Sequence, residues 1–181
     1  MPCIEVVTEL FHHRWNVPVL GSLHSGATRF VVLENRLGAS RDALRASLTS
    51  LQSAGLVTPN PGYGHPLRPE YLLTAKGTEV APACVRYSLL AERLGVVTVA
   101  FRKWTAPLLL ALDEGHTRFN GLQLALESVS PRSLSQGLRA MLESDLVVRR
   151  VEDGFPPRPS YRLTRGGRGL ASAIATIADR L

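Results

Sequence analysis

The fold of this chain is decided by the stretch Ser130-Pro-Arg-Ser-Leu-Ser-Gln-Gly-Leu-Arg-Ala-Met-Leu-Glu-Ser-Asp-Leu-Val147, which predicts a helix followed by the start of a strand. Ser130 can accept a hydrogen bond from a free amide at the helix N-terminus, and Pro131 suits the first helical position because no amide partner is needed there. The residues expected to pack recur at helical spacing: Leu134, Leu138, Met141 and Leu142. The other faces carry small polar and basic side chains that are free to contact a partner: Arg132, Ser133, Ser135, Gln136 and Arg139.

The segments on either side of this helix complete a known order of elements. Downstream, residues 146–151 and 159–163 are rich in strand-forming residues and flank Asp153-Gly154, which predicts a hairpin with a Pro-rich tip. Upstream, residues 104–112 predict a short apolar helix, and a second helix is expected from residue 119 to near residue 127. Three helices, a hairpin and a final helix are the order of a winged helix-turn-helix.

An internal repeat indicates that the chain holds two copies of this unit. The matched segments keep one register with a single inserted residue. They are 14–20 with 103–109 and 26–30 with 115–119 at an offset of 89, then 40–57 with 130–147 and 68–74 with 158–164 at an offset of 90. Chance does not produce this many matches in one register, so we interpret the chain as two copies of one domain.

The first copy predicts the same elements as the second. We expect helices over residues 4–13, 15–23 and 30–37, a fourth helix that Ser40 caps and Gly55 ends, a wing over residues 57–73, a helix from residue 75 to about residue 94 that Pro82 interrupts, and a connection over residues 95–102. The predicted fold class is therefore mainly α with small β-hairpins (α+β). It comprises two tandem winged helix-turn-helix domains, residues 1–95 and 96–181.

Composition limits the classes of function. The chain has 181 residues, of which 45% are hydrophobic and 20% charged, as in a globular protein. Its net charge is +6 and its isoelectric point is near 10.0, which suits a polyanionic partner. No apolar run reaches the roughly 18 residues that a membrane span needs, and the N-terminus has no signal-peptide pattern. We therefore expect a cytoplasmic protein with no membrane partner.

The sequence offers no catalytic or metal-binding pattern. The two cysteines, Cys3 and Cys84, cannot form a disulfide framework, and no Cys or His spacing indicates zinc. No motif combines a nucleophile, a base and a group that orients the base. We expect no enzymatic activity, no metal and no cofactor.

Several motifs resemble those of the HxlR family of bacterial winged helix-turn-helix regulators. They are Lys103-Trp, Arg118-Phe, Ser130-Pro-Arg-Ser-Leu-Ser-Gln and, above all, Pro156-Pro-Arg-Pro-Ser-Tyr-Arg-Leu-Thr164. The resemblance covers about residues 3–95 and 101–181, and it implies transcription regulation through double-stranded DNA. Family members usually form homodimers through their terminal helices. In a tandem chain this implies a pseudo-dimer with residues 81–95 and 170–181 at the pseudo-twofold axis, as a monomer or as a homodimer of tandem chains.

One cysteine also bears on this resemblance. Cys3 lies some dozen residues before Trp15 and resembles a cysteine that many family members carry near the N-terminus, sometimes with a sensing role. Its spacing is one residue short of the family's. An ordinary thiol is the alternative interpretation.

The residue types predict how DNA would be bound. Arginine makes forked contacts with phosphates and with guanine, and glutamine pairs with adenine. The candidate DNA-binding residues are Ser40, Arg41, Arg45, Thr49 and Arg68 in the first copy and Ser130, Arg132, Ser133, Ser135, Gln136, Arg139 and Arg158 in the second. An ordinary solvated helix face is the alternative for each residue. For the whole chain the alternative is a protein-interaction module that has lost DNA binding.

Three further expectations follow from the repeat. The recognition helices should lie about 34 Å apart on one face of the molecule, matching successive major grooves. Trp15 and Trp104, at matched positions, should be largely buried. The second copy should dominate DNA affinity, because Arg132 stands where the first copy has Asp42, and because residues 96–181 have a net charge of +4 against +2 for residues 1–95.

Overall fold

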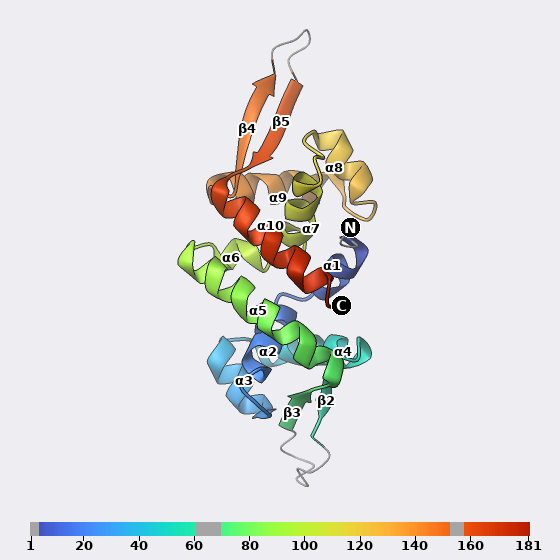
Figure 1. The fold of residues 1–181 in the computed structure, drawn as a ribbon, viewed down its shortest axis with the longest axis vertical. Helices are drawn as coiled ribbons and strands as arrows, with labels where there is room; N and C mark the ends of the chain where they lie inside the picture. The colour runs from blue at the N-terminus through green and yellow to red at the C-terminus, as the bar shows by residue number, and fades with distance from the viewer. Residues whose placement is uncertain (1–3, 61–69, 153–157) are drawn as a thin grey trace.

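A computed structural model describes residues 4–60, 70–152 and 158–181, without the side chains of residues 152 and 158. Figure 1 shows an elongated molecule in which the two halves of the chain follow one another along the long axis, each with a hairpin at its outer end. The first half contains α1 (Ile4–Leu10), α2 (Asn16–Leu23), β1 (Thr28–Arg29), α3 (Phe30–Leu37), α4 (Arg41–Ser53), β2 (Val57–Pro59), β3 (Glu70–Leu73) and α5 (Ala75–Arg93). The second contains α6 (Val97–Ala100), α7 (Thr105–Asp113), α8 (Phe119–Ala125), α9 (Pro131–Glu143), β4 (Val147–Glu152), β5 (Arg158–Leu163) and α10 (Arg165–Ala178). This order confirms the mainly α fold with small β-hairpins.

The two hairpins are antiparallel and differ in their third strand. In the first half β3 lies between β1 and β2, and Thr28 pairs with Tyr71. The second half has only β4 and β5 among the described strands, but the backbone amide of Tyr161 still donates to the carbonyl of Thr117 at 2.7 Å. Thr28 and Tyr71 match Thr117 and Tyr161 in the repeat, so the same contact is present in a reduced form.

The halves repeat side-chain contacts as well as elements. Each repeated contact joins a side chain to a backbone carbonyl and holds the start of a helix. Asn16 Nδ2 donates to Leu10 O at 2.9 Å, and at the matched position Thr105 Oγ1 donates to Val99 O at 2.8 Å. Likewise Thr74 Oγ1 donates to Gly55 O at 2.6 Å, and its match Thr164 Oγ1 donates to Asp145 O at 2.7 Å. The repeat therefore holds at the level of individual hydrogen bonds.

Helix α1 belongs to the first half in sequence but packs against α7 and α10 of the second half. Its buried residues Val7 and Leu10 provide the apolar contact. The helix ends at Leu10, so the expected extension to His13 is wrong. The bond from Asn16 Nδ2 occupies the Leu10 carbonyl, and the chain then turns into α2. This exchange of a helix ties the halves together.

Helices α5 and α10 form a second contact between the halves. Arg180 Nη1 at the end of α10 donates to the carbonyl of Glu79 near the start of α5 at 3.0 Å. The expectation that Pro82 interrupts α5 is wrong, because the helix runs unbroken through it. Burial of the neighbouring Ala81 and Ala83 outweighs the local preference of proline. The connection after α5 also contains the short helix α6, which was not expected.

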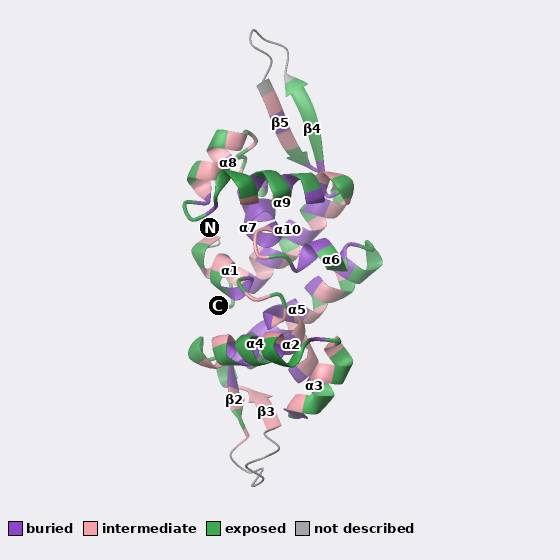
Figure 2. Ribbon diagram, turned by 180° about the vertical axis from the view of Figure 1, so that it is seen from behind, coloured by how far each residue is buried: buried purple, intermediate pink, exposed green. Residues whose placement is uncertain are grey.

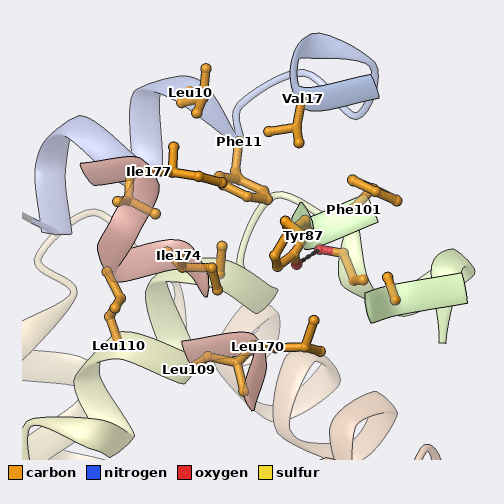
Figure 3. Close-up of a cluster of buried hydrophobic side chains, with 14 of the residues drawn as sticks. Leu10, Phe11, Val17, Tyr87, Phe101, Leu109, Leu110, Leu170, Ile174 and Ile177 are labelled. Atoms are coloured by element: carbon orange, nitrogen blue, oxygen red, sulfur yellow. Dashed lines mark hydrogen bonds between the residues drawn. The ribbon is translucent and has the colours of Figure 1, made fainter. Parts of the chain in front are cut away.

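One continuous core joins the halves (Figure 3). At its centre Tyr87 of α5 stands edge-on to Phe11 and Phe101, with ring centroids 5.4 Å and 5.5 Å apart. Such edge-to-face pairs are favourable beyond the area they bury. The aromatic rings come from the end of α1, from α5 and from the segment after α6, so the core is shared between the two copies.

The two tryptophans correct another expectation. Trp15 and Trp104 occupy matched positions, but both are only partly buried against the core. Each ring carries a cation over its face, from Arg14 at 5.3 Å and from Lys103 at 4.9 Å. They line the margin of the core and do not fill it.

Within the described parts of the chain, no helix combines the length and the apolar character that crossing a bilayer demands.

Candidate nucleic-acid interface

Helix α9 presents one buried and one exposed side, as its sequence predicts. Ser130 caps it by accepting a bond from the amide of Ser133 at 3.1 Å, and the two hydroxyls are also bonded at 2.9 Å. The buried side consists of Leu134, Leu138, Ala140 and Met141, with Leu142 partly buried. The exposed side consists of Ser130, Arg132, Ser135, Gln136 and Arg139, with Ser133 partly exposed.

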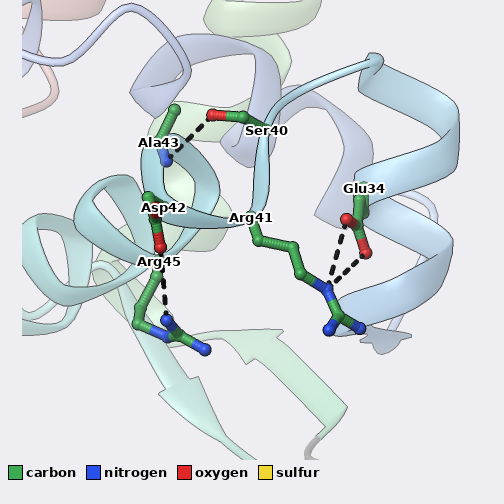
Figure 4. Close-up of polar contacts among 6 residues, drawn as sticks. All are labelled: Glu34, Ser40, Arg41, Asp42, Ala43 and Arg45. Atoms are coloured by element: carbon green, nitrogen blue, oxygen red, sulfur yellow. Dashed lines mark hydrogen bonds and ion pairs between the residues drawn. The ribbon is translucent and has the colours of Figure 1, made fainter.

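Helix α4 has the same construction with different charges (Figure 4). Ser40 accepts a bond from the amide of Ala43 at 3.4 Å. Arg41 Nε lies 3.4 Å from both carboxylate oxygens of Glu34 in α3, and Arg45 Nη1 lies 3.5 Å from Asp42 Oδ1. Thr49 is exposed further along the helix. Both arginines of this helix are therefore held beside carboxylates.

The two helices differ in how free their arginines are. Arg139 in α9 pairs with Glu143 at 2.9 Å, whereas Arg132 has no ion pair among the described residues. Side chains of Arg45 and Asp42 are 69% and 97% exposed, and ion pairs of this kind contribute less than about 1 kcal/mol. A phosphate can therefore displace Asp42 from Arg45, but Arg132 needs no such exchange.

The second hairpin adds exposed basic residues that were not among the candidate DNA-binding residues from the sequence. Strand β4 exposes Arg149 and Arg150, and β5 exposes Arg162. The first hairpin has Pro59 and Asn60 at the positions matched to Arg149 and Arg150. Two consecutive arginines in a predicted wing strand were a usable signal. The second wing is thus the more basic one within the described residues.

The structure places α4 and α9 on one face of the molecule. Both lie toward the viewer in Figure 2 with a row of exposed residues, while α5 and α10 cover the opposite face in Figure 1. The hairpins extend from the two ends of the same elongated body. Two exposed helices flanked by two wings thus form one extended surface. The spacing of about 34 Å stays a prediction.

The remaining candidate residues are not placed on this surface. Arg68 and Cys3 lie outside the described residues, and so does the side chain of Arg158, although its backbone pairs with Glu152 in the β4–β5 ladder. The other cysteine, Cys84, is buried in α5, and burial raises the pKa of its thiol to about 12. Over residues 4–60, 70–151 and 159–181, no group of three or more His, Cys, Asp or Glu side chains is placed to hold a metal ion.

Known proteins match this chain in two ways. The model of the HxlR-like helix-turn-helix family matches it twice, over residues 10–94 and 99–180. The first match begins at the end of α1 and the second within α6, and they end just after α5 and α10.

Curated relatives match over about one winged-helix unit. The chain is similar to the uncharacterized HTH-type transcriptional regulator YtfH of Escherichia coli (strain K12), with 32% identity over 77 residues, 42% of this chain and 61% of that protein. It is also similar to the uncharacterized HTH-type transcriptional regulator YvaP of Bacillus subtilis (strain 168), with 32% identity over 82 residues, 45% of this chain and 76% of that protein. A regulator of Methanothermobacter thermautotrophicus is 29% identical over 77 residues, 42% of this chain and 59% of its own length.

Proposed function

Because this chain belongs to the HxlR-like helix-turn-helix family, we propose that it is a sequence-specific DNA-binding transcriptional regulator with two recognition helices and two wings in one chain. The observation that carries this proposal is the shared face of α4 and α9, with a wing at each end. A dimeric regulator needs two subunits to present such a face. Here one chain supplies both, so the expected target is double-stranded DNA with two half-sites.

The exposed side of α9 gives this proposal its chemistry. Arg132, in the first turn, is suited to bidentate contact with guanine, and Gln136, about one turn later, is suited to adenine. Arg139 lies further along the helix and is suited to a phosphate. Arg149, Arg150 and Arg162 place positive charge on the wing, where it can follow the DNA backbone. Helix α4 would enter the second half-site with Arg41, Arg45 and Thr49.

The two copies would act as one unit. We keep residues 1–95 and 96–181 as the two domains, with α1 as the element exchanged between them. The helix exchange and the shared core favour one chain per operator. A complex of two chains per operator, measured by light scattering of the bound species, would contradict this part of the proposal.

The test is a salt titration. Duplexes recovered by selection from genomic fragments are labelled, and binding is followed by fluorescence anisotropy from low to high salt. We expect affinity to fall linearly on a log–log plot, because binding to phosphates releases counterions. Replacing Arg149 and Arg150 together with alanine should flatten the slope by about one unit for each phosphate that is no longer neutralised.

The matched control is Arg86→Ala, on the exposed side of α5 away from the proposed surface. It should leave the slope and the affinity unchanged. Selection that enriches no duplex, or affinity that does not respond to salt, would contradict DNA binding. Such a result would favour a protein-interaction module on the same scaffold.

A further inference from the structure

A cavity of about 620 Å³ lies between α2, α3, α5 and α6. Trp15, Pro18 and Leu89 contribute apolar walls, and Phe101 closes the side that faces the core. Arg14 and Arg36 lie on its rim together with Glu92. This volume is within the range of small-molecule sites, which are mostly apolar with a few polar groups that orient the ligand.

The second half holds a matching cavity of about 600 Å³. Five of its ten lining residues match residues of the first cavity at the offset of the sequence repeat. Trp104 replaces Trp15, Leu126 replaces Leu37, and Thr8 of α1 takes the position of Val97 in α6. Each cavity is therefore completed by a short helix at the N-terminal side of its neighbouring copy. We call the first the α3 cavity and the second the α8 cavity.

The two cavities have opposite charge. At matched positions the α3 cavity has Arg36 where the α8 cavity has Ala125, and Ser25 where the α8 cavity has Glu114. The α8 cavity is lined by four glutamates and, among its described lining residues, by no basic side chain. Both copies keep the same fold although the matched residues differ in charge, so folding does not require an arginine at position 36. The differences in charge instead distinguish the two cavities.

We propose that the α3 cavity binds a small aromatic carboxylic acid. The ring of such a molecule would lie against Trp15 and Phe101, and its carboxylate would reach the guanidinium groups. Arg36 is exposed, and its Nη1 donates to Ser22 O at 3.2 Å, which leaves its remaining donors for a bidentate contact. Arg14 already stacks on Trp15 at 5.3 Å, so its positive charge is fixed beside the aromatic wall.

The charges favour an anion over a neutral or cationic ligand. Two arginines face one glutamate, Glu92, in the α3 cavity. A cation would be drawn to the glutamates of the α8 cavity, whereas a carboxylate is repelled there. The same molecule is therefore expected in the α3 cavity and not in the α8 cavity. Small-molecule binding in the α3 cavity does not depend on the proposed DNA binding.

The test uses 2-naphthoate and its uncharged analogue 2-naphthamide, titrated into the full chain by calorimetry. We expect 2-naphthoate to bind one to one and 2-naphthamide to bind about tenfold more weakly, because it lacks the charge-assisted bonds. Arg36→Ala should weaken 2-naphthoate about tenfold, the loss expected from about 1.4 kcal/mol. This variant copies Ala125 of the other half, so the fold tolerates it. The control Arg86→Ala should bind as the wild type does.

Tryptophan fluorescence locates the ligand. Trp104→Phe leaves Trp15 as the reporter, and its emission should change on adding 2-naphthoate, whereas that of Trp15→Phe should not. The proposal is overturned if the two compounds bind equally, if neither binds, if Arg36→Ala and Arg14→Ala both retain wild-type affinity, or if only the Trp15→Phe variant responds.

Discussion

The hydroxyl of Tyr87 in α5 donates a hydrogen bond to the carbonyl oxygen of Ala100 at the end of α6, 2.7 Å away (Figure 3). Tyr87 is fully buried, and burial raises the pKa of its phenol far above the ordinary value, so the hydroxyl stays protonated as a donor. The bond fixes the connection between the two copies to the shared core. It also sets Phe101 against the Tyr87 ring.

Removing this hydroxyl should weaken the whole molecule. In Tyr87→Phe the Ala100 carbonyl loses a buried donor, and we expect the free energy of unfolding to fall by about 1–2 kcal/mol. Urea denaturation measures the change. Tyr161→Phe, at a partly exposed tyrosine, is the control and should change stability by less. Equal losses of stability in the two variants would show that the hydrogen bond to Ala100 contributes no more to the free energy of unfolding than the hydroxyl of Tyr161 does.

The first turns of α5 and α10 depend on glycine. A Cβ on Gly77 would lie 2.0 Å from the carbonyl oxygen of Leu56, and one on Gly167 would lie 2.1 Å from that of Leu146. Gly77→Ala and Gly167→Ala should each lower the free energy of unfolding by roughly 1–3 kcal/mol, since the helix must move off the strand. Gly121→Ala in α8 meets no atom within 4 Å and should be neutral or stabilising. Thermal melts of the three variants compare them directly.

Asp145 has a φ of 52°, the one positive value among the described residues other than glycine. Its match in the first copy is Gly55, with a φ of 68°. The left-handed conformation costs an L-residue roughly 1–2 kcal/mol, and glycine loses roughly 0.5–1 kcal/mol more on folding. Asp145→Gly should therefore raise the free energy of unfolding by about 0.5–1 kcal/mol, and Gly55→Asp should lower it by a similar amount. A drop in melting temperature for Asp145→Gly would contradict this account.

Cys84 should be chemically silent in the native protein. Its thiol has a pKa of about 12, and alkylation requires the thiolate. In a Cys3→Ser variant at pH 8, iodoacetamide should not label the folded chain and should label it fully in denaturant. Mass spectrometry measures the modification. Labelling of the folded chain at the rate of a free thiol would mean that α5 opens readily.

DNA affinity should depend more on the second copy than on the first. Arg132 is exposed and has no ion pair among the described residues, whereas Arg41 is held by Glu34. Arg132→Ala should therefore weaken binding to a selected operator by roughly 1–3 kcal/mol, which is the loss expected when one contact with a base is removed. Arg41→Ala should weaken binding by less. Anisotropy titrations on one duplex compare the two. Equal losses, or a fully symmetric operator, would argue for equal copies.

The sequence by itself determined the repeat, the order of the longer helices and the hairpins, and the caps. Ser40 and Ser130 cap α4 and α9 as their positions predict, and Leu134, Leu138 and Met141 are buried at helical spacing. These features depend on residues a few positions apart, because capping and helix amphipathicity are local properties of the chain. Recognition of the family rests on the same local patterns.

The tertiary structure alone decided how the copies are joined and which side chains share a site. Helix α1 ends early because Asn16 takes its last carbonyl, and it packs on the opposite copy. Helix α5 continues through Pro82, whose neighbours Ala81 and Ala83 are buried. Trp15 meets Arg36 and Phe101 around one cavity only after three separate segments have packed. These features depend on contacts between residues far apart in the chain. The free energy of packing outweighs local conformational preferences there, and the spacing of apolar residues within one segment does not indicate which other segment it will contact.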